Sequence, residues 1–157
     1  VPEGLESLKI RYHGDYHLGQ VLLRQNDFVI IDFEGEPARS LDERRRKHSP
    51  LRDVAGMVRS FNYAAYTAAS HITAEQSEDS VQVETAIGQW ETEVTRTFLQ
   101  SYEAHVRIAG IYSDWDQARG LLSLFMLEKA FYELRYELNN RPSWVRIPLL
   151  GIADLLE

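Results

Sequence analysis

The 157-residue sequence contains no cysteine. Disulfides, thiolate zinc sites and cysteine nucleophiles are therefore excluded, and any bound metal must be held by oxygen or imidazole ligands. No apolar run approaches the roughly 20 residues that a membrane-spanning helix needs, and the first residues lack the basic start and apolar stretch of a signal peptide. We therefore expect a soluble, cytoplasmic protein that does not bind a membrane.

Positive charge is also scarce. The 17 Lys and Arg residues against 24 Asp and Glu residues give a formal net charge of −7. Nucleic acids demand clustered positive surface, so this balance argues against a nucleic-acid partner. The basic cluster Arg44–Lys47 follows two acidic residues, and we interpret it as a solvated loop. With 44% hydrophobic and 26% charged residues, the composition is typical of one globular domain.

Residues 1–48 differ in character from the rest, because they are rich in β-formers, glycine and turn residues. Alternation and turn signals predict short strands over 8–12, 21–24 and 28–33, with a hairpin turn at 25–27. This region should contain the chemistry of the domain.

Residues 49–157 are predicted to be helical. Apolar spacing predicts helices over 50–70 and 86–109. A third helix should begin after a cap at Ser113 or Asp114 and end near Asn140, ahead of Pro142. Its expected core positions are Ala118, Leu121, Leu122, Phe125, Met126 and Leu138. We predict an acidic surface loop over 75–84 and a last short segment over 143–156, interrupted by Pro148. The fold class is thus mainly α with a small β-hairpin region.

Two motifs flank the predicted hairpin. Residues 13–20 read HGDYHLGQ, and residues 31–35 read IDFEG. Either one alone would be weak, because an Asp in a glycine-containing loop is usually a turn former. Together and in this order they resemble kinase machinery, in which a loop Asp receives the proton of the acceptor hydroxyl and an Asn and an Asp hold Mg²⁺. The resemblance makes Asp15 the catalytic base, and Gln20 and Asp32 the metal ligands.

Three further residues are expected to support the catalytic loop. His13 is interpreted as a structural residue under the loop, and His17 as a brace of its backbone. Asp53 matches an acidic residue that kinase-like folds place to accept hydrogen bonds from the loop. A simpler alternative for Asp53 is a favourable charge in the first turn of a helix.

The His-Gly-Asp start of the first motif and a long run of residues that follows it point to a narrower family than kinases in general. Residues 30–66 read IIDFEGEPARSLDERRRKHSPLRDVAGMVRSFNYAAY. With HGDYHLGQ, this run is similar to the signature of maltokinases, some of which are fused to trehalose synthases. The resemblance implies the C-terminal lobe of a protein-kinase-like, aminoglycoside phosphotransferase-like fold. It also implies ATP and Mg²⁺ as cofactors and maltose as the acceptor that becomes maltose 1-phosphate.

The acceptor site is expected on one stripe of the third helix. Its residues recur three or four apart, opposite the apolar face, and offer aromatic, carboxylate and amide groups to a sugar. A solvated helix face would give a similar pattern. The candidates are Glu34, Lys129, Tyr132, Glu133, Tyr136, Glu137, Asn140, Arg141 and Trp144.

A kinase also has an N-terminal lobe with a glycine-rich loop and a strand lysine. The sequence has no Gly-x-Gly-x-x-Gly motif, and none of its three lysines lies in a matching strand. We therefore expect the chain to be the C-terminal part of a longer kinase, inactive by itself and prone to self-association through the surface that the lobe would cover.

Two other interpretations stay open at this point. One is a kinase of the same fold that acts on an aminoglycoside, choline or homoserine. The other is a helical domain that docks a partner, for example within a trehalose synthase fusion. Nucleotide-dependent binding of Mg²⁺ would distinguish a kinase from a docking domain.

Overall fold

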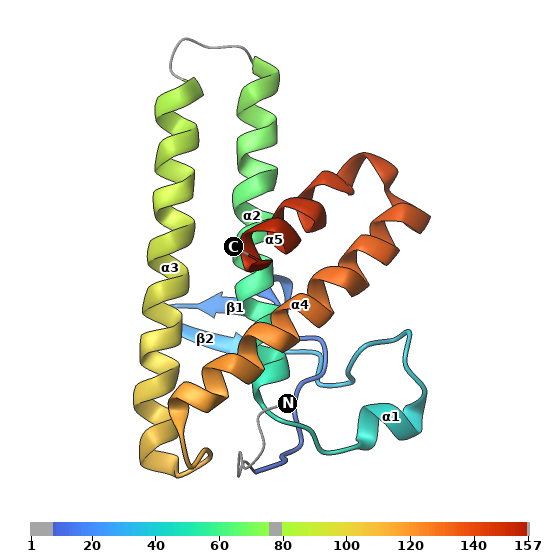
Figure 1. Ribbon diagram of the computed structural model, residues 1–157, viewed down its shortest axis with the longest axis vertical. Helices are drawn as coiled ribbons and strands as arrows, with labels where there is room; N and C mark the ends of the chain where they lie inside the picture. The colour runs from blue at the N-terminus through green and yellow to red at the C-terminus, as the bar shows by residue number, and fades with distance from the viewer. Residues whose placement is uncertain (1–7, 76–79, 157) are drawn as a thin grey trace.

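The computed structural model describes residues 8–75 and 80–156. They form a mainly helical molecule with one small antiparallel hairpin (Figure 1). The elements in chain order are η1 (Leu18–Gln20), β1 (Val21–Arg24), β2 (Asp27–Ile30), α1 (Leu41–Arg45), α2 (Leu51–Glu75), α3 (Ser80–Ala109), α4 (Trp115–Asn140), η2 (Pro142–Trp144) and α5 (Arg146–Leu156).

Helix α2 is the central element. It lies alongside α3, and α4 crosses it and is itself followed by α5 (Figure 1). The apolar face predicted for this helix is confirmed, since the predicted positions are all buried. They are Leu51, Val54, Ala55, Val58, Phe61 and Ala65. Buried residues of α3 and α4, including Val106 and Leu122, complete the same core.

Helix α4 begins as predicted. The Asp114 carboxylate accepts hydrogen bonds from the backbone N–H groups of Asp116 and Gln117, which otherwise have no partner in the first turn. Its predicted core positions hold at Ala118, Leu121 and Leu122. Leu138 is an exception because its side chain is 57% exposed near the end of the helix.

The predicted bounds of strand β1 are confirmed, whereas those of the other two predicted strands are not. β2 ends at Ile30 rather than residue 33, because the chain leaves the sheet at Asp32, which has a positive φ of 62°. The strand predicted over 8–12 is wrong. Only Ile10 pairs, with His48, through an isolated two-hydrogen-bond bridge.

Two helix boundaries also differ from the prediction. The acidic loop expected over 75–84 is wrong, because α2 includes Glu75 and α3 already begins at Ser80; residues 76–79 lie outside the described residues. Pro148 does not interrupt the last segment. It lies in the first turn of α5, where a backbone N–H has no helical partner to lose.

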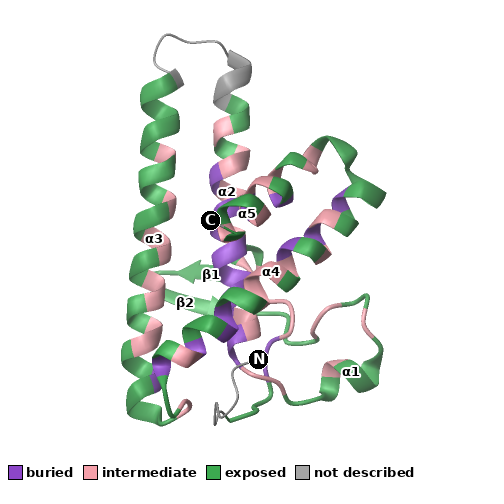
Figure 2. Ribbon diagram, viewed as in Figure 1, coloured by how far each residue is buried: buried purple, intermediate pink, exposed green. Residues whose placement is uncertain are grey.

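Burial divides the molecule into two parts. Figure 2 shows buried residues concentrated on α2 and on the inner side of α4, whereas the hairpin is exposed. Leu23 and Phe28 are each 70% exposed. In the described ranges, no helix combines the length and the apolar character needed to cross a membrane.

Candidate active site

The loop that contains Asp15 is fixed to the first turn of α2. The two oxygens of Asp53 accept hydrogen bonds from the backbone N–H groups of His13 (2.7 Å) and Gly14 (2.9 Å). Gly14 has a φ of +88°, a conformation that favours glycine. Burial raises the pKa of Asp53, and the two backbone hydrogen bonds oppose that rise. Asp53 therefore makes the hydrogen bonds to the loop backbone that the sequence predicted.

His13 connects this loop to the second motif. Its Nδ1 accepts a hydrogen bond from the Asp15 N–H (3.3 Å), and its Nε2 lies 2.7 Å from the carbonyl oxygen of Ile31. The ring is buried and packs against Phe33, with 4.9 Å between ring centroids. A neutral imidazole with the proton on Nε2 satisfies both contacts. His13 thus holds the segment before Asp32 against the loop that contains Asp15.

His17 closes the other end of the loop. Its Nδ1 accepts a hydrogen bond from the Gly19 N–H (3.1 Å) and caps η1. Its Nε2 lies 3.8 Å from one oxygen of Asp15. The other oxygen of Asp15 lies 3.8 Å from the Lys129 ammonium on α4. Asp15 therefore lies between His17 and Lys129, too far from either side chain for a direct hydrogen bond at these distances.

Gln20 and Asp32 are brought together, as the sequence predicted. The Gln20 side-chain amide donates to Asp32 Oδ2 at 3.0 Å, and the Ile31 backbone N–H donates to the backbone carbonyl oxygen of Gln20 at 3.0 Å. Rotation of the amide by half a turn would exchange its nitrogen for its carbonyl oxygen.

This pair fits a Mg²⁺ site. Mg²⁺ prefers one or two carboxylates, with nucleotide phosphates and waters as its other ligands. Among the described residues, no cluster of three or more His, Asp and Glu side chains could hold a metal by itself. Asp32 and Gln20 are the residues that could hold Mg²⁺ together with nucleotide phosphates.

A cavity of about 660 Å³ opens beside Asp15, between α2, α4 and the loop after β2. Six of the predicted acceptor residues line it, and these are Lys129, Tyr132, Glu133, Tyr136, Glu137 and Arg141. Aromatic rings and charged groups thus face one space, next to the proposed base.

Three of the predicted acceptor residues do not line the cavity. Glu34 is exposed, and its backbone carbonyl accepts a hydrogen bond from Arg44. The Asn140 amide donates to the Tyr136 carbonyl within the helix. The Trp144 ring lies under the Arg141 guanidinium, 4.7 Å from ring centroid to Cζ, and so supports a lining residue.

The alternative that the stripe is a solvated face is wrong for Glu133 and Glu137, which are 9% and 1% exposed. Arginines make this burial tolerable, because each carboxylate is paired and hydrogen-bonded. Arg141 donates two hydrogen bonds to Glu137, and Arg59 on α2 donates two to Glu133. Burial raises the pKa of Glu133, and Arg59 counteracts that rise.

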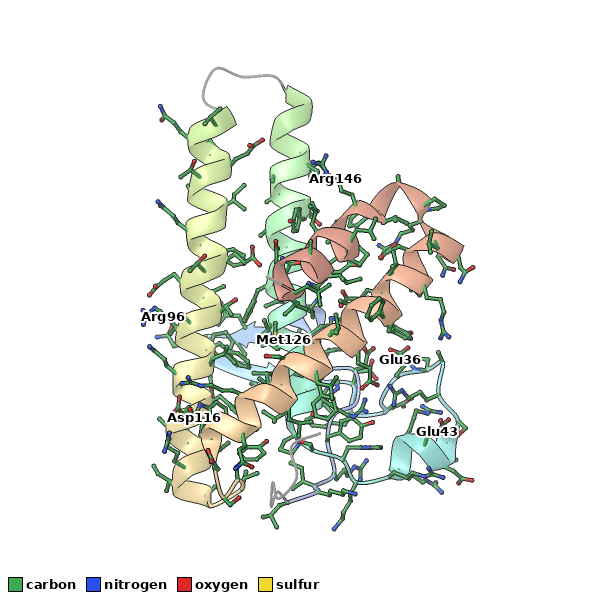
Figure 3. The ribbon with its side chains drawn as sticks, viewed as in Figure 1. Glu36, Glu43, Arg96, Asp116, Met126 and Arg146 are labelled. Carbon is green, nitrogen blue, oxygen red and sulfur yellow. The ribbon has the colours of Figure 1, made fainter. Side chains whose placement is uncertain are left out.

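Sequence reasoning missed residues outside the stripe. Glu36, labelled in Figure 3, lines the cavity from the loop after β2. Burial and the hydrogen-bonded Glu36 carboxylate raise the pKa of Tyr132 to about 12. Ser60 and Tyr63 line the cavity from α2, and Tyr63 donates to Glu137 at 3.2 Å.

Gly56 was also missed, although its sequence position carries a signal. It lies inside α2, and a Cβ there would come 2.5 Å from the carbonyl oxygen of Tyr16. The loop that contains Asp15 therefore contacts α2 directly at this glycine. Glycine is unfavourable inside helices, so its presence in a helical pattern points to a close backbone approach.

Comparisons with known proteins find similarity to glucosamine kinases. No family model matches the chain. Over 94% of its length it is 28% identical to glucosamine kinase from Streptacidiphilus jiangxiensis, and over 92% it is 27% identical to glucosamine kinase from Mycolicibacterium smegmatis. The chain spans about a third of the length of these curated relatives, 32% and 34%.

Solved structures give the same likeness. A glucosamine kinase in complex with glucosamine, ADP and inorganic phosphate superposes with a TM-score of 0.72 at 25% identity, covering 92% of this chain and 32% of that one. Another crystal form of glucosamine kinase gives the same TM-score. The similarity is therefore to one part of a sugar kinase, and the maltose-specific part of the sequence resemblance stays a prediction.

Proposed function

We propose that this chain is the catalytic and acceptor-binding part of an ATP-dependent sugar kinase, with the C-terminal lobe of a protein-kinase-like fold. The observation that carries the proposal is the position of Asp15. It lies on a loop anchored by Asp53, and it borders a cavity lined by tyrosines and carboxylates. The similarity to part of glucosamine kinase supports the same reading.

The proposed reaction needs few groups from the chain. An acceptor hydroxyl in the cavity donates its proton to a carboxylate oxygen of Asp15 as its own oxygen bonds to the γ-phosphorus of ATP. The bond from that phosphorus to the bridging oxygen breaks, and ADP leaves. Most of the rate in phosphoryl transfer comes from positioning and charge neutralisation. A Mg²⁺ held by Asp32 and Gln20 would supply neutralisation at the phosphates.

Lys129 also belongs to this arrangement. Its ammonium lies 3.8 Å from Asp15 and 5.0 Å from the centre of the Tyr132 ring. Attraction between the ammonium and the carboxylate at this distance restrains the position of the Asp15 side chain. Lys129 therefore orients Asp15 towards the cavity.

The finer proposal is that the acceptor is maltose. The signature in residues 13–20 and 30–66 supports it, and Tyr132 and Tyr136 offer two aromatic surfaces to the apolar faces of sugar rings. Glucosamine is the second candidate, because both curated relatives act on it by name. Among the described residues Glu36 has no salt bridge, and its carboxylate could receive an amino group.

An acceptor panel tests both levels of the proposal. ATP consumption is measured with maltose, glucosamine, glucose, trehalose and an aminoglycoside, in the longest natural form of the protein. We expect turnover with maltose and a loss of about 10²–10⁴-fold in Asp15→Asn, the contribution of a general base. Turnover with glucosamine alone would retain the sugar kinase and contradict the maltose assignment. No turnover with any sugar would favour a docking role.

A further inference from the structure

Behind the acceptor cavity, a buried arginine holds one of its carboxylates. Arg59 is 3% exposed, and its Nε and Nη2 both donate to Glu133 Oε2, at 2.9 and 2.7 Å. No hydrogen bond from another described residue reaches Glu133 Oε1, and Glu133 borders the cavity. One oxygen is thus fixed from behind while the other remains for a ligand.

Helix α5 closes the space on the far side of that arginine. Figure 1 shows α5 lying across α2, and the two helices are in contact. At the crossing, Gly151 is buried against the Arg59 guanidinium. A Cβ added to Gly151 would overlap Nη1 of Arg59 and come within 2.8 Å of its Cζ and Nη2.

A glycine at this position is not explained by the helix itself. Glycine is disfavoured inside helices, and Gly151 has no positive φ that would require it. The close approach to Arg59 does explain it, because a side chain at this position would have to displace the buried guanidinium. Since the guanidinium donates to Glu133 through a rigid planar fork, displacing it would also move the carboxylate.

We propose that Gly151 and Arg59 are positioning residues for the sugar acceptor, and that α5 acts through them to fix Glu133 against an acceptor hydroxyl or amino group. This inference rests on the proposed sugar kinase function. It assigns acceptor recognition to a helix that does not line the cavity. ATP binding should be independent of this contact, since Asp32 and Gln20 lie in the hairpin region.

The test separates acceptor binding from nucleotide binding. In Gly151→Ala we expect the KM for the acceptor sugar to rise by about tenfold or more, the loss of one charge-assisted hydrogen bond. The KM for ATP should stay within about twofold. Gly88→Ala and Gly120→Ala are matched controls in α3 and α4, since a Cβ at either position meets nothing within 4 Å. Both should leave the two KM values unchanged.

A second substitution tests the route through Arg59. Lysine lacks the Nη1 atom that the alanine methyl group would strike, and its ammonium still carries the charge that Glu133 needs. Gly151→Ala combined with Arg59→Lys should therefore recover most of the acceptor KM lost in Gly151→Ala. A purely structural defect would make the two changes additive or worse.

Glu133→Gln keeps the experiment decisive if Gly151→Ala does not fold. It should raise the acceptor KM alone, because the amide retains an acceptor for Arg59 but loses the charge. An acceptor KM in Gly151→Ala equal to that of Gly88→Ala would overturn the inference and leave the sugar kinase standing. If the wild-type protein phosphorylates no sugar, the proposed function fails first and the inference with it.

Discussion

The region before α2 and the helical region after it differ in what holds them in place. In the helical region, Leu51 is fully buried and lies in a core shared by α2, α3 and α4. In the hairpin, Leu23 and Phe28 are each 70% exposed. The proposed reacting groups Asp15, Gln20 and Asp32 all lie in the first region. The packed core thus lies in the helical region and the proposed reacting groups lie before it, and Asp53 joins the two regions.

The largest expected effect is on stability, from the same substitution made in both regions. Leu51→Ala removes a fully buried side chain and should lower the free energy of unfolding by about 2–5 kcal/mol. Leu23→Ala should change it by no more than about 0.5 kcal/mol, because that side chain is exposed. Urea unfolding followed by circular dichroism measures both. Equal losses would show that the hairpin carries as much of the packing as α2.

The next largest effect is expected on activity, with stability unchanged. Asp32→Asn should lower kcat on the order of 10²-fold and raise the Mg²⁺ concentration needed for half-maximal rate, because a charged metal ligand is lost. Asn tolerates the positive φ at this position, so the fold should be retained.

Asp27→Asn is the control for that prediction. Asp27 is an exposed carboxylate of the same hairpin, and it accepts a hydrogen bond from the Phe28 N–H. Its replacement should leave the Mg²⁺ dependence unchanged. A similar rise in both variants would remove Asp32 from the metal site.

Asp53→Asn should affect both properties, because Asp53 joins the two regions. An amide keeps one accepting oxygen, so one of the N–H donors of His13 and Gly14 loses its partner. We expect a loss of about 1–3 kcal/mol in the free energy of unfolding together with a fall in kcat.

Asp114→Asn is the matched cap variant. The two backbone bonds of Asp114 go to Oδ1 alone, so asparagine can keep them both. Stability and kcat should therefore stay near the wild-type values. A normal kcat in Asp53→Asn would contradict the role of this carboxylate in holding the loop.

The smallest expected effect is a pH dependence at His48, where the two regions meet. Burial first, and then the positive charges of Arg52, Arg39, Lys9 and Arg46, lower the pKa of His48 below 6.5. A histidine with a lowered folded pKa contributes stability above its unfolded pKa and loses it as the pH falls through the folded value. His48→Gln should therefore lose less stability than the wild type between about pH 7.5 and about pH 5.5.

Thermal unfolding at the two pH values checks this difference. His71→Gln, at an exposed position on α2, serves as the control. If His48→Gln and the wild type respond equally to pH, then His48 does not contribute to the acid sensitivity.

Local signals allowed much of the fold to be predicted. The hairpin strand β1, the buried face of α2 and the Asp114 cap all follow from patterns within a few residues. The predictions that failed depend on where an element begins or on contacts with distant parts of the chain. Pro148 reads as a helix breaker until its place in a first turn is known.

The candidate site shows the same limit. Asp15, Gln20 and Asp32 could be proposed as site residues because the order and spacing of the two motifs are visible in the sequence. Glu133 was predicted as an acceptor residue, but its burial was not predicted, because its partner Arg59 lies 74 residues away. The burial of Glu137 could have been predicted, since Arg141 follows it by four residues and pairs with it. Gly56 and Gly151 carried a readable signal as glycines inside helical patterns.

The central claim is that the Asp15 loop and the α4 cavity form one sugar site. An amide NMR titration of the ¹⁵N-labelled chain with maltose and with glucosamine tests it most directly. We predict that one of the two sugars shifts the resonances of residues 13–17 together with those of Lys129, Tyr132 and Tyr136, and leaves Trp90 on α3 unchanged. Shifts confined to α3, or no saturable shift with either sugar, would contradict the account.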